Sequence, residues 1–244
     1  MRHPTDYGQK EKTALLTTPY EELYSKIAFL YNNNMIKKKI PAAPSIRRLP
    51  SYLHIIRQAQ ADGLEFISGT VIANELVLEP IQVRKDLAMT GITGKPKRGY
   101  PVAELITAIE HFLGWDSVKN AILIGAGNLG TALTGYQEFK NHGLVFVAAF
   151  DNNAQKIGTK IHNVPVYSFD DLKPTLKNLN ASIAVLTVPS TEAQSITDKL
   201  VDAGIKAIWN FTNIKLKVPE DVVVQREDLT SGYALLSVVM GKAD

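Results

Sequence analysis

The sequence predicts an α/β protein: a helical segment with a basic hairpin, then a parallel-sheet domain, then a C-terminal helix. Three observations support this fold class. A G-x-G-x-x-G turn follows an apolar run near the middle of the chain, apolar runs alternate with helical patterns after it, and closely spaced helical patterns precede it. A chain of 244 residues is long enough to bury two modest cores.

The composition excludes several classes of protein. The chain has no cysteine, so it forms neither disulfides nor thiolate zinc sites. No segment approaches the roughly 20 apolar residues that span a bilayer, and Met1–Asp6 is too polar to begin a signal peptide. We expect a cytoplasmic protein with no membrane partner and no metal site.

The positive charge is concentrated in one part of the chain. Residues 35–100 hold eleven lysines and arginines against five acids, while the whole chain has a net charge of only +3. Such an excess indicates a surface for a polyanion. A basic face that only meets solvent is the alternative.

Residues 1–34 are predicted as an N-terminal extension with one helix. Thr18 and Glu21 form a capping box, and apolar side chains recur at helical spacing until Asn32. A helix with such an apolar face must cover another part of the protein or a partner subunit.

Residues 35–116 are predicted as a winged helix-turn-helix domain. A first helix begins at Ser45, or later because of Pro50, Ser68 caps a second helix, and Pro80 starts a third. We expect the third helix to turn Ile81, Val83, Leu87 and Ala88 inward. A glycine-rich basic hairpin follows, and then a connecting helix that starts at Pro101 and ends at Gly114.

Two helices at a tight turn followed by a basic hairpin can place one helix in a major groove and the hairpin along the DNA backbone. A small helical domain with solvated charges is the alternative. The candidate DNA-binding residues are Arg48, Gln82, Arg84, Lys85, Lys95, Lys97 and Arg98.

The strand 120–124 leads into the turn Gly125–Gly130, which predicts a Rossmann domain over residues 117–226. In such a turn Gly125 permits the tight bend, Gly127 lets phosphates approach the backbone, and Gly130 lets the following helix pack closely. We expect this helix to run to His142 and to present free N–H groups to the pyrophosphate. A glycine-rich strand–helix turn that binds no nucleotide is the alternative.

An acid stands where a second strand ends, at Asp151, about 20 residues after the last glycine. Its carboxylate can accept hydrogen bonds from both hydroxyls of an adenosine ribose, which favours NAD(H) over NADP(H). Later apolar runs predict further strands over 164–167, 183–188, 206–211 and 222–224, and ligands bind beyond the carboxyl ends of such strands. The candidate cofactor residues are Gly125, Ala126, Gly127, Asn128, Leu129, Gly130, Asp151, Val188, Pro189, Asn210 and Phe211.

Together these features resemble the Rex family of bacterial redox-sensing transcriptional repressors, over roughly residues 36–240. The residues that carry the resemblance are Ile40-Pro41, Arg48-Leu49, Tyr52-Leu53, Gln82–Leu87, Arg98–Tyr100, Gly125–Gly130, Ala148–Asp151, Lys156–Gly158, Val188-Pro189, Ala203–Lys206, Asn210-Phe211 and Asp228-Leu229.

The resemblance implies a homodimer that binds double-stranded operator DNA and that NADH, but not NAD+, releases from it. It further implies that Tyr136 and Asp228 pair across the dimer in the NADH-bound form. The apolar pattern itself predicts a last helix from Asp228 to about Met240, and such a helix is usually covered by a core or by a dimer partner. With the resemblance, residues 227–244 are expected to be a dimer-exchange helix. The family usually has serine and two aromatic residues where this chain has Ala88-Met89-Thr90, and its wing is usually richer in glycine.

Two other functions remain open at this point. An NAD-dependent dehydrogenase needs a proton donor beside the nicotinamide, and the histidines after the glycine turn, His142 and His162, are poorly placed for that role. We therefore predict no catalytic residue and no enzyme. The second alternative is an NAD(H)-binding paralogue whose DNA binding is lost or altered.

Overall fold

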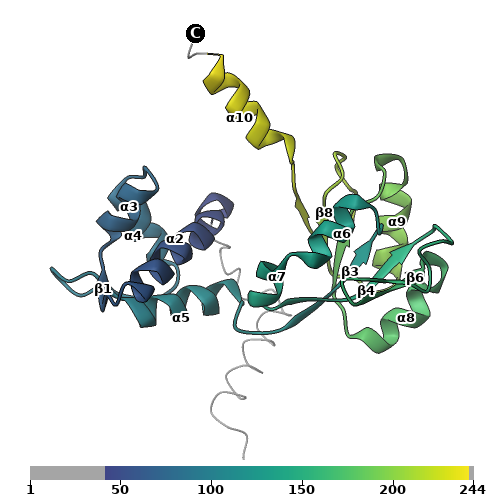
Figure 1. The fold of residues 1–244 in the computed structure, drawn as a ribbon, viewed down its shortest axis with the longest axis horizontal. Helices are drawn as coiled ribbons and strands as arrows, with labels where there is room; N and C mark the ends of the chain where they lie inside the picture. The colour runs from purple at the N-terminus through teal and green to yellow at the C-terminus, as the bar shows by residue number, and fades with distance from the viewer. Residues whose placement is uncertain (1–41, 242–244) are drawn as a thin grey trace, which may run out of the picture. The chain divides into compact units, whose positions relative to one another are not determined.

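The computed structural model describes residues 42–241 (Figure 1). The predicted N-terminal helix up to Asn32 lies outside these residues. None of the helices in the described part of the chain is long and apolar enough to cross a membrane.

The first part of the described chain is a winged helix-turn-helix domain, as the sequence predicts. Its buried side chains come from every helix and from both short strands and form one apolar core. The strands β1 and β2 pair antiparallel at the base of the wing, with Ile67 opposite Tyr100. The elements are α2 (Ala43–Ala61), β1 (Phe66–Ile67), α3 (Gly69–Glu75), α4 (Pro80–Ala88), β2 (Tyr100–Pro101) and α5 (Val102–Leu113).

Most predicted helix boundaries of this domain are confirmed. The Ser68 hydroxyl accepts a hydrogen bond from the Val71 N–H (3.2 Å), Pro80 is the first residue of α4, and Gly114 ends α5 in the left-handed conformation (φ 66°). Two details differ. Helix α2 already begins at Ala43 and continues through Pro50, and Pro101 belongs to β2, so that α5 begins one residue later than predicted.

The buried face of α4 differs from the prediction. Val83, Asp86 and Leu87 are buried, whereas Ile81 is 54% exposed and Ala88 is also exposed. Residues that are three and four positions apart share a helix face, and Ile81 and Ala88 lie off the face that Val83 and Leu87 define. The predicted inward placement of Ile81 and Ala88 was therefore wrong. The buried face includes instead an acid, Asp86, which the prediction did not name.

The turn between α3 and α4 contains a strained valine. Val77 has φ 53° and is 94% exposed, although β-branched residues rarely adopt the left-handed conformation. We expect Val77→Asn to raise the free energy of unfolding by about 1 kcal/mol, because asparagine tolerates this conformation. Urea unfolding measures the change. Val118→Asn is the control, since Val118 is 73% exposed without positive φ, and an equal gain there would contradict the explanation.

The second part is a Rossmann domain built on a seven-stranded sheet with the order β5-β6-β4-β3-β7-β8-β9. Alternate residues of the strands face opposite sides, so the sheet has two apolar faces. Helices α8 and α9 pack on one face, and α6 packs on the other (Figure 1). The strands are β3 (Lys119–Ile124), β4 (Leu144–Asp151), β5 (Lys160–Ile161), β6 (Val164–Ser168), β7 (Ile183–Leu186), β8 (Ala207–Asn210) and β9 (Val223–Arg226).

The helices of this domain follow the predicted alternation, with two departures. The helix after the glycine turn is broken, because Gly135 disfavours helix and Tyr136 is extended (φ −76°, ψ 106°). The edge strand β5 is antiparallel to β6, and His162 lies in the hairpin turn between them. The helices are α6 (Asn128–Gly135), α7 (Gln137–Asn141), the 3₁₀ turn η1 (Phe169–Asp171), α8 (Leu172–Leu179), α9 (Ser190–Asp202) and α10 (Thr230–Met240).

The terminal helix α10 has no buried residue. It begins at Thr230, and the Asp228 carboxylate before it accepts hydrogen bonds from the Thr230 N–H (2.9 Å) and hydroxyl (2.6 Å). Its large apolar side chains are 57–73% exposed, an unusual state for so apolar a segment. The residues are Leu229, directly before the helix, and Tyr233, Leu235, Leu236, Val238, Val239 and Met240 within it.

Candidate dinucleotide and nucleic-acid sites

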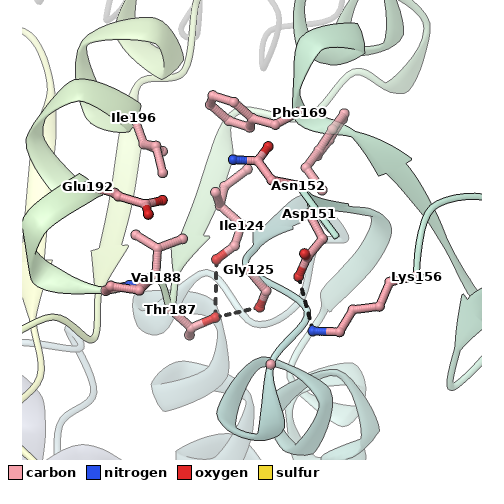
Figure 2. A pocket seen from close by; sticks show the side chains of 13 residues that line it. Ile124, Gly125, Asp151, Asn152, Lys156, Phe169, Thr187, Val188, Glu192 and Ile196 are labelled. Atoms are coloured by element: carbon pink, nitrogen blue, oxygen red, sulfur yellow. Dashed lines mark hydrogen bonds and ion pairs between the residues drawn. The ribbon is translucent and has the colours of Figure 1, made fainter. Parts of the chain in front are cut away.

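The Rossmann sheet reverses its strand order at β3, which pairs with β4 on one side and with β7 on the other. The segments that follow these three strands lie at the same carboxyl edge and line a cavity of about 230 Å³ (Figure 2). This is where open α/β sheets bind their ligands.

The glycine turn after β3 lines this cavity with Gly125 and Gly127. Gly125 has φ 93°, and its N–H donates to the carbonyl oxygen of Phe150 at the end of β4 (2.8 Å). A Cβ on Gly130 would overlap the carbonyl oxygen of Gly125, so only glycine lets α6 begin this close to the strand. A Cβ on Gly127 would meet nothing within 4 Å, which leaves room for a ligand. All three roles predicted for these glycines fit the geometry.

Asp151 ties the end of β4 to the glycine turn. One carboxylate oxygen accepts from the Ala126 N–H and the other from the Asn153 N–H, both at 2.8 Å, and the Lys156 ammonium is 3.4 Å from the first (Figure 2). Burial alone would raise the pKa of Asp151, but the N–H groups of Asn153 and Ala126 and the Lys156 charge together lower it. Asp151 is therefore a carboxylate at neutral pH, as ribose recognition requires.

The structure brings most of the predicted cofactor residues together. Gly125, Gly127, Asp151, Val188 and Pro189 line the cavity. The N–H of Ala126 bonds to Asp151, as described above. Asn128, Leu129 and Gly130 open α6 directly after the turn.

Asn210 and Phe211 are not among the lining residues of this cavity. The Asn210 oxygen accepts from the N–H and hydroxyl of Thr212 (2.9 and 2.7 Å), and its amide donates to the carbonyl oxygen of Ile214 (3.0 Å). This buried side chain thus shapes the loop after β8. The ring of Phe211 lies 5.1 Å from that of Trp209.

Sequence reasoning missed several residues of the cavity. Thr187 holds the turn, since its hydroxyl lies 2.8 Å from the carbonyl oxygen of Gly125 and 3.1 Å from that of Ile124 (Figure 2). Lys156 could have been found as a cation five residues after the predicted acid Asp151. No local sequence feature marks Glu192 and Ile196, which reach the cavity from α9. The lining residues that were not predicted are Ile124, Phe150, Asn152, Lys156, Phe169, Thr187, Glu192 and Ile196.

The helix α4 presents its basic residues to solvent. Arg84 and Lys85 are exposed, while Gln82 is half-buried and its amide donates to Asp86 (2.8 Å). Asp86 is 1% exposed and also accepts from the hydroxyl of Tyr52 on α2 (2.7 Å). One of the five acids of the basic segment is therefore buried, which makes the surface more positive than the sequence count implies. Sequence reasoning missed this link between α2 and α4.

The wing, residues Lys95–Gly99, carries the other predicted contacts. Lys95, Lys97 and Arg98 are all exposed, and Lys97 stands at φ 62° in the turn. On α2, the Arg48 guanidinium donates to the hydroxyl of Ser45 one turn earlier (3.2 Å). The exposed cations of α4 and of the wing suit contacts with phosphates and base edges.

The two predicted switch residues both reach solvent. Tyr136 is 55% exposed at the break between α6 and α7, with its ring edge-on to Phe139 (5.0 Å). Asp228 precedes α10, and its bonds from the Thr230 hydroxyl and N–H lower its pKa, so it is also a carboxylate at neutral pH.

Comparison with known proteins identifies the family. The chain is 64% identical over 206 residues to the redox-sensing transcriptional repressor Rex of Treponema denticola, covering 84% of this chain and 98% of that protein. The chain belongs to the Rex family. The Rex protein of Bacillus subtilis is 40% identical over 80% of this chain and 90% of its own length.

Solved structures of the Rex family agree with the fold. RSP, a Rex-family repressor, has been solved with β-NAD+ and operator DNA (TM-score 0.78, 34% identity, 84% of this chain and 95% of that chain). It has also been solved with β-NADH (TM-score 0.77, 33% identity, 84% and 97%). Two family models match in addition: a putative DNA-binding protein N-terminus over residues 39–88 and a CoA binding domain over residues 116–214. The resemblance to the Rex family is confirmed.

Proposed function

We propose that this protein is a transcriptional repressor that senses the NADH/NAD+ ratio and releases operator DNA when NADH binds. The observation that carries the proposal is the pairing, in one Rex-family chain, of a helix-turn-helix with exposed cations and a glycine turn that faces an ionised Asp151. The relatives are named as transcriptional repressors, and RSP has been solved with NAD+ and operator DNA and with NADH. We propose no catalytic residue.

The proposed organisation assigns residues 35–116 to DNA binding, 117–226 to NAD(H) binding and 227–244 to dimer exchange. In the second domain, the free N–H groups at the start of α6 and the open side of Gly127 would hold the pyrophosphate. Asp151, with Lys156 beside it, would hold the adenosine ribose. The nicotinamide would lie toward Phe211 and the loop that Asn210 shapes.

DNA contacts are proposed for the exposed cations of the first domain. Each lysine or arginine that reaches a phosphate releases counterions, so the affinity should fall steeply with salt. Gln82 is positioned beside them by its bond to Asp86. The proposed contacts are the exposed Arg84, Lys85, Lys95, Lys97 and Arg98, together with Gln82 and the half-buried Arg48.

A homodimer is proposed because α10 exposes a continuous set of apolar side chains. An exposed apolar helix of this kind is normally covered by another part of a protein, and exchange between subunits would cover it in both. Sedimentation of the full chain tests this: a monomer at micromolar concentration would contradict it.

NAD+ and NADH differ only at the nicotinamide ring, which is cationic and flat in NAD+ and neutral and puckered in NADH. To act as a switch, the ring must bind one arrangement of the dimer better than the other. A change of about 100-fold in DNA affinity needs about 2.7 kcal/mol of coupling, which a few contacts at an exchanged helix can supply.

The direct test is DNA binding by the purified protein. A duplex is first selected from a random-sequence pool, and fluorescence anisotropy then follows its binding with increasing NADH or NAD+. We expect NADH to lower the affinity and NAD+ to leave it unchanged. Equal effects of both nucleotides would refute the sensor, and failure to select any duplex would leave an NAD(H)-binding paralogue without DNA binding.

The proposed switch pair predicts a specific variant. Asp228→Ala should weaken NADH-driven release about tenfold while NADH affinity stays largely unchanged, because the partner of Tyr136 across the dimer is lost but the nucleotide site is not. Anisotropy and NADH fluorescence measure the two effects. Thr230→Val removes the hydroxyl that donates to Asp228 but keeps the Asp228 carboxylate. NADH should still release this variant from DNA. Unchanged release by Asp228→Ala would make the pair structural only.

A further inference from the structure

The wing is a tightly closed hairpin. The Lys95 N–H donates to the Gly99 carbonyl oxygen (2.7 Å), and the Arg98 N–H donates to the Lys95 carbonyl oxygen (3.1 Å). Pro96 fixes the first central position of this turn, and Lys97 occupies the second with φ 62°, where glycine or asparagine is usual. The turn therefore keeps a strained lysine at its tip.

The returning arm of the wing lies directly against β1. Gly99 has φ 90°, and a Cβ on it would overlap the carbonyl oxygen of Ile67. This close approach brings Arg98 beside Phe66, the neighbour of Ile67 in the strand. Successive side chains of a strand point to opposite faces, so Ile67 is buried in the core (3% exposed) while Phe66 faces the wing.

Two cations of the wing lie over the same aromatic ring. The Arg98 guanidinium carbon is 3.9 Å from the centre of the Phe66 ring, and the Lys95 ammonium is 5.3 Å from it. Both distances are within the range of cation–π attraction. The carboxylate of Glu65 is 3.9 Å from Arg98, but it is 84% exposed, and such surface pairs hold side chains weakly. The ring, which also faces Lys95, is therefore a restraint that the two cations share.

We propose that Phe66 is a positioning residue of the DNA-binding surface: its ring orders the Lys95 and Arg98 side chains of the wing before DNA binds. The inference rests on the proposed DNA contacts of the wing. A long cationic side chain loses conformational freedom when it is fixed on a phosphate, and a side chain that is already ordered loses less. Phe66 itself need not touch DNA.

The test removes the aromatic ring but leaves an apolar side chain and changes no charge. Phe66→Leu should weaken binding to the selected duplex five- to tenfold, whereas Phe66→Trp, which retains an aromatic face, should bind within twofold of the wild type. In NMR spectra of the free protein, the Arg98 side-chain resonances should lose their ring-current shift in Phe66→Leu. Thermal unfolding of each variant reports whether the hairpin base still folds.

A double-mutant cycle separates positioning from a structural role. In a Lys95→Gln/Arg98→Gln background, Phe66→Leu should cause no further loss, because the residues through which it acts are gone. An equal loss in both backgrounds, or no loss in the wild type, would overturn the proposal while the repressor function stands. An unchanged affinity and salt dependence of the Lys95→Gln/Arg98→Gln protein itself would instead remove the wing contacts on which the inference rests. Failure of the wild type to bind any duplex would overturn both.

Discussion

Replacing Gly130 with alanine is expected to destabilise the Rossmann domain by about 3 kcal/mol or more and to abolish NADH binding. The added Cβ would overlap the carbonyl oxygen of Gly125 and would also lie 2.8 Å from the Thr187 hydroxyl and 2.9 Å from Leu123. Backbone atoms cannot move aside as a flexible side chain can, so α6 or the turn must shift, and overpacking of this kind is costly. Thermal unfolding and hydrogen exchange of the amides in β3, β4 and β7 measure the loss.

Gly127→Ala is the matched control within the same turn. Gly127 has φ −79°, and its Cβ would meet nothing within 4 Å, so this variant should keep its stability within about 0.5 kcal/mol. Its NADH affinity should nevertheless fall at least tenfold, because the methyl group would occupy the side from which phosphates approach. The variant should then bind DNA but no longer be released by NADH. Normal NADH affinity in Gly127→Ala would show that the dinucleotide does not cross this turn.

Replacing Asp86 with alanine is expected to destabilise the winged-helix domain by about 3 kcal/mol and to weaken DNA binding severely. The carboxylate, which is 1% exposed, accepts from the Tyr52 hydroxyl (2.7 Å) and from the amide of the half-buried Gln82 (2.8 Å). Removing a buried acceptor leaves its donors without that bond, and no water can replace it cheaply. The bond from Tyr52 joins α4 to α2, so without it the orientation of α4 and its DNA contacts should be lost.

Two variants separate the fold of this domain from its contacts. Tyr52→Phe removes one donor and keeps the buried ring, so it should cost about 1 kcal/mol. Lys85→Gln changes an exposed side chain of α4 and should leave stability within about 0.5 kcal/mol while it lowers DNA affinity and the salt dependence. Urea unfolding and anisotropy titrations check both. Full stability of Asp86→Ala would contradict the role of this carboxylate in holding α4.

The core of both domains could be predicted from local patterns. The apolar residues Leu49, Tyr52 and Ile56 of α2 recur at helical spacing, and the structure buries all three on one face. The glycine turn and Asp151 form a motif whose spacing follows from one strand, one turn and one helix, so they could be placed together without a structure. Glu192 and Ile196 could not, because they reach the cavity from α9, which carries no local signature of a ligand site.

The predictions that the structure contradicts failed for physical reasons. The burial of Asp86 could not be predicted from its residue type, since charged residues are seldom buried, and its hydrogen bonds from Tyr52 and Gln82 account for it. The inward placement of Ile81 followed its apolar character, but its position on α4 lies off the core face. The helix after the glycine turn was extended too far because the helix-disfavouring Gly135 was passed over, and a Cβ there would lie 2.7 Å from the His162 ring of the β5–β6 hairpin.

The amino-acid sequence alone determined the fold class, the order of the domains and the nature of the dinucleotide turn, because periodicity, caps and glycine spacing act over a few neighbouring residues. The tertiary structure alone decided which side chains of separate elements meet: Asp86 with Tyr52, Thr187 with the glycine turn, and Phe66 with Lys95 and Arg98. Such meetings depend on how elements distant in the chain pack, and no local pattern encodes that packing.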